Sequence, residues 1–230
     1  MSFGLGRGRA LEPGTYGLSG DDLPPLPDDV LDHPEKAHID PRDWFQHPGR
    51  RFELEIGSGK GTFLVQQAAL QPGTNFLGVE WAHEFYKYAA DRVRRHAFDN
   101  VLMMHTDATQ LLRWRIPDAV CDVVHLYFSD PWPKSRHHKR RVVQDSFLEQ
   151  CHRVLVERGE LRIVTDHADY WTWMEEHFDR WTGADHAPRY NRKDFVRPDS
   201  AGDGEVVGTN FERKYIEEGR PFYSTILIRA

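Results

Sequence analysis

Five acidic residues lie at or next to the ends of short apolar runs, and their spacing is the first feature of the sequence that suggests chemistry. They are Glu55, Glu80, Asp107, Asp130 and Asp166. Successive intervals are 25, 27, 23 and 36 residues, and the first three match one strand, loop and helix. Because parallel strands end at one edge of a sheet, we expect these carboxylates to line one crevice. Each acid taken alone is at least as well explained as a helix N-cap.

Glycines follow the first acid in the stretch EIGSGKGT, residues 55–62. A phosphate-binding P-loop has Lys followed by Ser or Thr, whereas Lys60 is followed by Gly61. A dinucleotide-binding loop of the GxGxxG type needs glycine where this chain has Thr62. The stretch is therefore an acid followed by GxGxG, in which the glycines let the chain turn tightly beneath a ligand without pyrophosphate.

This loop resembles the first motif of Rossmann-like methyltransferases that bind S-adenosylmethionine. By that resemblance, Glu80 stands where an acid accepts both ribose hydroxyls, and Asp107 resembles the residue that meets the adenine amino group. A cationic sulfonium also favours a pocket rich in carboxylates. The cofactor-binding residues that the resemblance implies are Glu55, Gly57, Gly59, Gly61, Glu80, Asp107 and Asp130.

The stretch DPWPKSRHHKRR, residues 130–141, places a carboxylate and two prolines directly after the apolar run VVHLYF. An acid followed by Pro and an aromatic residue resembles the acceptor motif of nucleobase and amino methyltransferases, and the prolines stiffen its loop. Together with GSGKG, TDHADYW and TNFE, the stretch is similar to the tRNA (guanine-N7-)-methyltransferase family over about residues 51–230. The resemblance implies methylation of a guanine in the variable loop of tRNA.

Guanine N7 has an in-plane lone pair, so the reaction needs no base to remove a proton. Positioning N7 in line with the sulfonium methyl group supplies up to about 7–11 kcal/mol. A nearby carboxylate stabilises the cationic product, and it also accepts hydrogen bonds from guanine N1 and N2. We therefore assign Asp130 as the catalytic residue.

Five cations lie within the eight residues 134–141, shortly after Asp130, and we expect them to contact RNA phosphates, with Trp132 stacking on a base. For two of them, Arg140 and Arg141, a solvated helix start is an equally good interpretation. The five are Lys134, Arg136, Lys139, Arg140 and Arg141.

By the resemblance, the substrate site comprises residues of the basic stretch, one strand-end acid and a block near the C-terminus. The residues are Lys134, Arg136, Asp166, Thr209, Asn210, Phe211 and Glu212. Thr209 and Glu212 also have the spacing of a capping box, and Asp166 equally well caps the helix that follows it. Capping and substrate contact are compatible at a helix N-terminus.

The apolar runs alternate with helical patterns, which is typical of an α/β domain. We expect a Rossmann-like methyltransferase fold, with a mostly parallel central sheet, helices on both faces and an antiparallel C-terminal strand at 221–230. The helices are expected at about 62–70, 82–97, 142–158 (closed by Gly159), 168–178 and 209–219, with a turn-rich segment at 183–205.

Residues 1–50 contain seven of the 14 prolines and show little periodicity. We expect them to form a Pro/Gly-rich extension to a single domain at 51–230. The extension is rich in acids at DDLPPLPDD, which is unusual for a segment that grips tRNA. Ordering on RNA, covering the cofactor and remaining disordered are all compatible with its sequence.

Composition limits the remaining possibilities. The net charge is −6, no apolar run approaches the ~20 residues that span a bilayer, and the N-terminus lacks an apolar signal segment. Two cysteines without CxxC spacing suggest reduced thiols in the cytoplasm. HEFYK at 83–87 fails the zinc pattern HExxH, so we expect no metal. The expected partner is tRNA and not a membrane, and both a monomer and a homodimer are compatible with the sequence.

Three other functions are alternatives to this one. Methylation of another nucleobase or of an amide is compatible with the acceptor motif alone. An RNA-binding module that has lost its cofactor site is disfavoured because the cofactor motifs are intact. A nicotinamide dehydrogenase is disfavoured by Thr62 and by the basic stretch.

Overall fold

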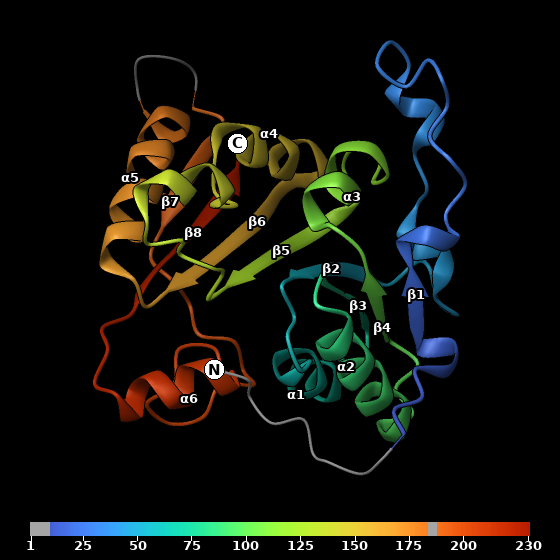
Figure 1. The fold of residues 1–230 in the computed structure, drawn as a ribbon, viewed down its shortest axis with the longest axis horizontal. Helices are drawn as coiled ribbons and strands as arrows, with labels where there is room; N and C mark the ends of the chain where they lie inside the picture. Colours follow the sequence, from blue (N-terminus) through green and yellow to red (C-terminus); the bar gives the residue numbers. More distant parts are fainter. Residues whose placement is uncertain (1–9, 184–187) are drawn as a thin grey trace.

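The computed structural model describes residues 10–183 and 188–230, and a sheet of eight strands runs through its centre (Figure 1). The strand order is β1-β4-β3-β2-β5-β6-β8-β7. Strand β8 runs antiparallel to both of its neighbours, β6 and β7. The strands are β1 (Gly17–Ser19), β2 (Arg51–Ile56), β3 (Thr74–Glu80), β4 (Val101–His105), β5 (Cys121–Tyr127), β6 (Leu155–Thr165), β7 (Tyr190–Lys193) and β8 (Tyr223–Arg229).

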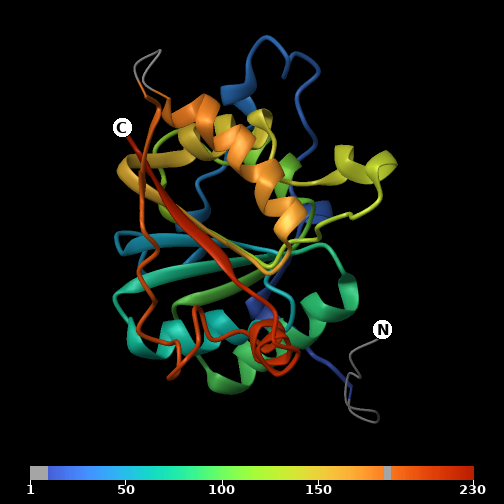
Figure 2. The ribbon, with the colours of Figure 1, turned by 90° about the vertical axis from the view of Figure 1, so that its left-hand side faces the viewer.

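Helices cover both faces of this sheet (Figure 2). Apolar side chains of α1 and α2 pack in one core, and those of α3, α4 and α5 pack in the other. The α-helices are α1 (Thr62–Leu70), α2 (His83–His96), α3 (Ala108–Trp114), α4 (Asp145–Val154), α5 (Ala168–Thr182) and α6 (Asn210–Glu217). Short 3-10 helices are η1 (Gly14–Tyr16), η2 (Gly20–Asp22), η3 (Pro34–Ala37), η4 (Pro41–Trp44) and η5 (Ser135–Arg140).

These features confirm the predicted fold class: a mostly parallel sheet between two helical layers, with an antiparallel C-terminal strand. Within residues 10–183 and 188–230, no helix has the length and apolar character needed to span a membrane.

The order of the strands defines a switch point between β2 and β5. From β2 the chain builds outward through β3 and β4, and it then crosses back to place β5 on the other side of β2. The loops that leave β2 and β5 therefore run in opposite directions across the sheet. Ligands of open α/β sheets bind in the crevice that such divergent loops leave at the strand ends.

Three local predictions are wrong. The helix expected at 142–158 ends at Val154, because Leu155 is buried and pairs with Cys121 at the start of β6. Gly159 is therefore not a helix cap. It lies at an irregularity of β6, where a Cβ atom would approach the carbonyl oxygen of Val156 to 2.9 Å.

Two short elements, α3 and β7, were not expected at all, and β7 falls within the segment that we expected to be turn-rich.

Residues 10–50 lie mainly along the edge formed by β4. Gly17–Ser19 form β1 and pair in parallel with Met103–His105. The carbonyl oxygen of Glu12 accepts a hydrogen bond of 2.7 Å from Arg94 Nε of α2. This segment thus extends the sheet by one short strand.

Candidate active site

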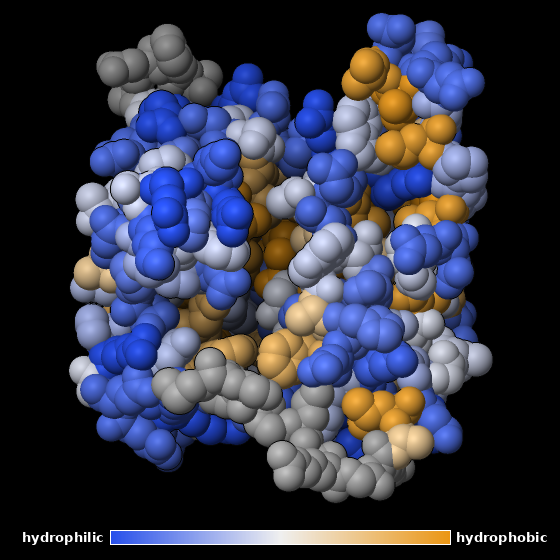
Figure 3. All heavy atoms as spheres, in the orientation of Figure 1, coloured by the Kyte–Doolittle hydropathy of each residue, from blue (hydrophilic) through white to orange (hydrophobic). Residues whose placement is uncertain are grey.

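A cleft of about 890 Å³ opens at the carboxyl ends of β2, β3 and β5. Figure 3 shows this face hollowed between hydrophilic rims, with apolar side chains at the floor. The expected site residues that line the cleft are Gly57, Gly59, Glu80, Asp107, Asp130 and Phe211. The structure therefore brings Glu80, Asp107 and Asp130 to one cleft, as the spacing of the acids predicted. Glu55 lies on an adjoining pocket, and Asp166 lines neither, so the prediction that all five acids share one crevice is wrong for Asp166.

A smaller pocket of about 50 Å³ adjoins the cleft, and the two share Gly57, Gly59 and several aromatic side chains. Glu55 lies on this pocket, and the residue is 3% exposed. Among the described residues, Glu55 Oε2 has no hydrogen-bond partner. Burial raises the pKa of Glu55 to about 8. A buried acceptor without a partner at a pocket wall is suited to a cationic ligand group.

The glycine loop leads from β2 into α1. Gly57, Gly59 and Gly61 all have positive φ angles, of 74°, 53° and 65°, a conformation that other residues adopt only with strain. Gly61 is the N-cap of α1, and a Cβ atom there would lie 3.1 Å from Ala89 Cβ of α2. Gly61 lines neither pocket in the described structure, so its place is structural, whereas Gly57 and Gly59 face the site.

Glu80 at the end of β3 fixes the glycine loop. Its Oε2 accepts a hydrogen bond of 2.8 Å from the Gly59 amide, and its Oε1 accepts one of 2.7 Å from the Ala82 amide. Burial raises the pKa of Glu80, and the nearby Asp130 carboxylate raises it further. Glu80 and Asp130 thus influence each other electrostatically at the cleft.

Asp107 serves as the N-cap of α3. Its Oδ1 accepts hydrogen bonds from the Thr109 amide at 2.8 Å and from Thr109 Oγ1 at 2.6 Å. The side chain also lines the cleft. Asp107 therefore both caps α3 and lies at the site.

Asp130 is exposed at the cleft on a loop with unusual backbone geometry. Phe128 and Trp132, two residues to either side, have φ angles of 54° and 43°. Left-handed conformations at non-glycine residues cost about 1–3 kcal/mol and persist only where neighbouring structure enforces them. Among residues 10–183 and 188–230, no group donates a hydrogen bond to the Asp130 carboxylate, so this acceptor is available to a ligand.

The basic stretch forms η5 and divides into two parts. Lys134 and Arg136 are exposed and lie outside the cleft lining, whereas Lys139 and Arg140 line it. The Arg140 guanidinium lies 5.0 Å from the ring centroid of Trp132. Arg141 also borders the cleft, but its side chain is buried, so the expectation that it contacts phosphate is wrong.

Asp166 lies at the end of β6 outside both pockets. Its Oδ2 accepts a hydrogen bond of 2.6 Å from Arg220. The N-cap of α5 is His167, whose Nδ1 accepts from the Tyr170 amide. The interpretation of Asp166 as a helix cap is therefore wrong.

The block at 209–212 forms the start of α6. Thr209 caps the helix, because its Oγ1 accepts a 3.1 Å hydrogen bond from the Glu212 amide. The fully buried Glu212 carboxylate accepts from the amides of residues 206–208. Asn210 Nδ2 donates to Thr62 Oγ1 at 2.9 Å and so ties α6 to α1. Phe211 lines both pockets.

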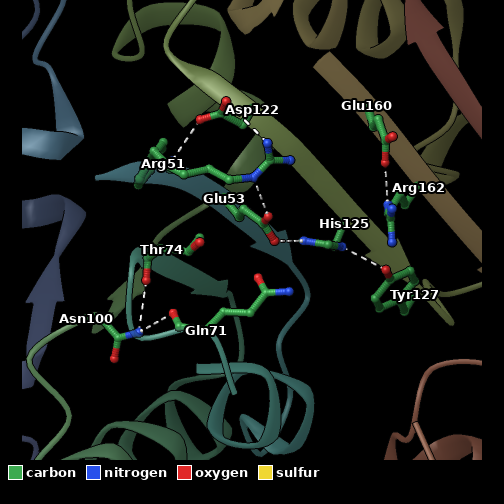
Figure 4. Close-up of polar contacts among 11 residues, drawn as sticks. Arg51, Glu53, Gln71, Thr74, Asn100, Asp122, His125, Tyr127, Glu160 and Arg162 are labelled. Atoms are coloured by element: carbon green, nitrogen blue, oxygen red, sulfur yellow. Dashed lines mark hydrogen bonds and ion pairs between the residues drawn. The ribbon is translucent and has the colours of Figure 1, made fainter. Parts of the chain in front are cut away.

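Sequence reasoning missed a row of buried polar residues beneath the smaller pocket (Figure 4). His125 Nε2 lies 2.8 Å from Glu53 Oε2, and His125 Nδ1 lies 2.7 Å from the hydroxyl of Tyr127, which lines the pocket. Burial lowers the pKa of His125, so a neutral ring donates to Glu53 and accepts from Tyr127. Alternation along β2 and β5 places Glu53 and Glu55 on one face, which is the signal that points to this row.

Comparisons with known proteins agree with this geometry. A family described as "Putative methyltransferase" matches residues 50–225. A tRNA (guanine-N(7)-)-methyltransferase of Corynebacterium diphtheriae is 39% identical over 142 residues, which are 62% of this chain and 55% of that protein. One from Streptococcus thermophilus is 30% identical over 200 residues, 84% of this chain and 91% of that protein. The chain thus spans about half the length of the first relative and most of the second.

Among solved structures, the aminoglycoside resistance methyltransferase NpmB1 has a TM-score of 0.54 at 14% identity, over 93% of this chain and 98% of that one. This similarity concerns the fold alone.

Proposed function

Because this chain belongs to the tRNA (guanine-N(7)-)-methyltransferase family, we propose that it transfers a methyl group from S-adenosylmethionine to N7 of a guanine in tRNA. By the resemblance of its motifs, this guanine lies in the variable loop. The observation that carries the proposal is the free Asp130 carboxylate, held on a strained loop at the strand switch point. The proposed catalytic domain is 51–230, with 1–50 as its extension, and the proposed location is the cytoplasm.

The donor set of the pocket fits S-adenosylmethionine. The unpartnered Glu55 oxygen is suited to the ammonium group of the methionine part. Gly57 beside it leaves open space above the loop. Glu80 keeps lone pairs for ribose hydroxyls, and Asp107 lies on the cleft for the adenine amino group. When bound, S-adenosylmethionine supplies an electrophilic methyl group on a sulfonium centre.

Asp130 acts on the acceptor base in this proposal. Its carboxylate accepts hydrogen bonds from guanine N1 and N2 and stabilises the positive charge that the base gains. No residue has to remove a proton from N7, because the attacking lone pair lies in the ring plane. Orientation of the base is therefore the main contribution of the protein.

The basic stretch supplies the proposed RNA contacts. Lys134 and Arg136 are exposed beside the cleft and suited to phosphates, with Arg140 near Trp132. Asn210 and Phe211 lie at the pockets, and Thr209 and Glu212 hold them there by fixing the start of α6. Asp166 pairs with Arg220 outside both pockets, so its proposed contact with the RNA is made beyond them.

The test is transfer of labelled methyl from S-adenosylmethionine to unmodified tRNA transcripts, with the product located by strand scission specific to N7-methylguanine. We expect label at a single guanine. Asp130→Asn should lower kcat by about 10²–10³ and leave the Kd for S-adenosylmethionine within about threefold, because its amide keeps the volume but loses the charge. Asp203→Asn, in an exposed loop, serves as the matched control. Near-normal turnover by Asp130→Asn would show that this assignment is wrong.

A further inference from the structure

Arg141, the last residue of the basic stretch, is anchored inside the protein and not presented to solvent. Its side chain is 1% exposed, and its Nε donates a 2.8 Å hydrogen bond to the carbonyl oxygen of Pro131. Its Nη2 donates to the Asp169 carboxylate. The guanidinium also lies 5.2 Å from the ring centroid of Tyr170 and 5.4 Å from that of Trp173. At 1% exposure, the Arg141 side chain presents almost no surface to a phosphate.

The carbonyl that Arg141 binds belongs to the residue next to Asp130. That residue lies within the strained segment between Phe128 and Trp132, which needs outside contacts to keep its conformation. The Asp130 side chain receives no hydrogen bond from the described residues, so its direction depends on the backbone. We propose that Arg141 is a positioning residue for methyl transfer, which fixes the Asp130 carboxylate by holding the Pro131 carbonyl.

The first turns of α5 complete this anchor. Trp173 Nε1 donates a 2.7 Å hydrogen bond to the Val143 carbonyl, and the Tyr170 hydroxyl accepts one of 3.2 Å from the Val143 amide. Helix α5 thus holds Val143, which follows Arg141 by two residues, and it also supplies the Asp169 carboxylate that Arg141 binds. The hydrogen bond from Arg141 lowers the pKa of Asp169, so the pair remains charged at neutral pH.

The planar guanidinium is essential to this role. It donates in two directions at once, toward Pro131 on the loop and Asp169 on α5, while its faces contact two aromatic rings. A lysine ammonium is a point charge on a flexible stem and does not reproduce this fork. Arg141→Lys therefore keeps the charge and most of the volume but releases the loop.

Kinetics of Arg141→Lys test the inference, which rests on the proposed function. A misplacement of about 1 Å costs on the order of 10²-fold in rate, so we expect kcat to fall about 10- to 100-fold. The KM for tRNA and the Kd for S-adenosylmethionine should stay within about threefold, and the slope of log KM against log salt should not change. A raised KM with a slope reduced by about one would identify a phosphate contact and overturn the inference.

Arg192 of β7 offers a matched control. Its guanidinium pairs with Glu175 of α5, lies 5.6 Å and 5.5 Å from the ring centroids of Trp171 and Phe178, and donates to Thr225 Oγ1. It lines neither pocket. Arg192→Lys should lower Tm without lowering kcat measured well below Tm. An equal loss of kcat in both variants would overturn the inference, because Arg141 would then contribute only to the stability of the fold.

Hydrogen–deuterium exchange gives a readout that does not need tRNA. Amides in the peptide 128–143 should exchange faster in Arg141→Lys than in wild type, and at the wild-type rate in Arg192→Lys. Unchanged exchange and unchanged kcat in Arg141→Lys would overturn the inference. Wild-type protein that fails to methylate tRNA would instead disprove the proposed function, while the exchange comparison would still test the anchor.

Discussion

A buried carboxyl group with one unpartnered oxygen lies at the smaller pocket, and its protonation should be coupled to cofactor binding. The pKa of Glu55 is raised to about 8 by burial, with a further increase from the charge of Glu80 and an opposing hydrogen bond from Ser58. Free protein at pH 7 therefore carries Glu55 mostly protonated. An ammonium group at the pocket favours the carboxylate, so binding should expel this proton.

Calorimetry of S-adenosylmethionine binding in buffers of different ionisation enthalpy measures that proton. We expect Glu55 to release a proton on binding at pH 7, and to release less at pH 9, where more of the free carboxyl group is already ionised. Glu55→Gln should lack this release. Protons that the ligand itself gains or loses are counted equally in both proteins. The same proton count for both proteins would contradict the assignment of Glu55 to the ammonium group.

The raised pKa of Glu55 also makes the free energy of unfolding depend on pH. The folded-state pKa of Glu55 lies above its ordinary value of 4.5, so the unfolded chain loses this proton at lower pH. The contribution of Glu55 to the free energy of unfolding therefore falls as pH rises from about 4.5 to about 8. Glu55→Gln should lack that part of the pH dependence in urea titrations.

At this scale, the sequence predicted positions better than roles. The acids at strand ends follow from parallel-sheet geometry, so Glu55, Glu80 and Asp130 could be placed without a structure. The role of Arg141 could not, because its burial depends on Asp169, 28 residues further along the chain. The ion pair of Asp166, which we expected at the substrate site or as a helix cap, could not be predicted either, because its partner Arg220 is 54 residues away and has no local signal.

At the scale of elements, η5 presents cations to the solvent beside the cleft. Lys134 and Arg136 are both exposed, and neither pairs with an acid in the described structure. If each contacts a phosphate, reversing both charges should reduce the slope of log affinity against log salt by about two and raise the KM for tRNA. Kd for S-adenosylmethionine should not change.

The double variant Lys134→Glu, Arg136→Glu is compared with Arg158→Glu as control. Arg158 is exposed near the amino-terminal end of β6, whereas the cleft lies at the carboxyl ends of the strands. The control should keep the wild-type KM and salt slope. An unchanged slope in the double variant would show that Lys134 and Arg136 are solvated surface residues that contact no phosphate.

Elements with strong local signals were predicted, and those that depend on tertiary context were not. The helix at 62–70 has the predicted bounds, and α6 was expected from a helical pattern with a capping Thr209. Short elements such as α3 and β7 carry too few residues for a period to be recognised. The end of α4 is set by the pairing of Leu155 with Cys121, which no local pattern reveals.

At the scale of the whole molecule, the order and direction of the strands bring the site residues together. Periodic spacing of the acids predicted one shared edge, but it did not distinguish the order of strands, because any parallel order preserves the same period. The switch point between β2 and β5 appears only in the structure. The net charge of −6 likewise describes the whole surface, whereas the proposed RNA contacts depend on one local stretch.

If N7 of a guanine in tRNA receives the methyl group, as we propose, replacing this one atom should abolish the transfer. Labelled methyl transfer is measured with a tRNA transcript containing guanine and with the same transcript containing 7-deazaguanine, in which carbon replaces N7. We expect stoichiometric labelling of the first transcript and none of the second. Equal labelling of both would contradict the proposal, because the acceptor would then be another atom.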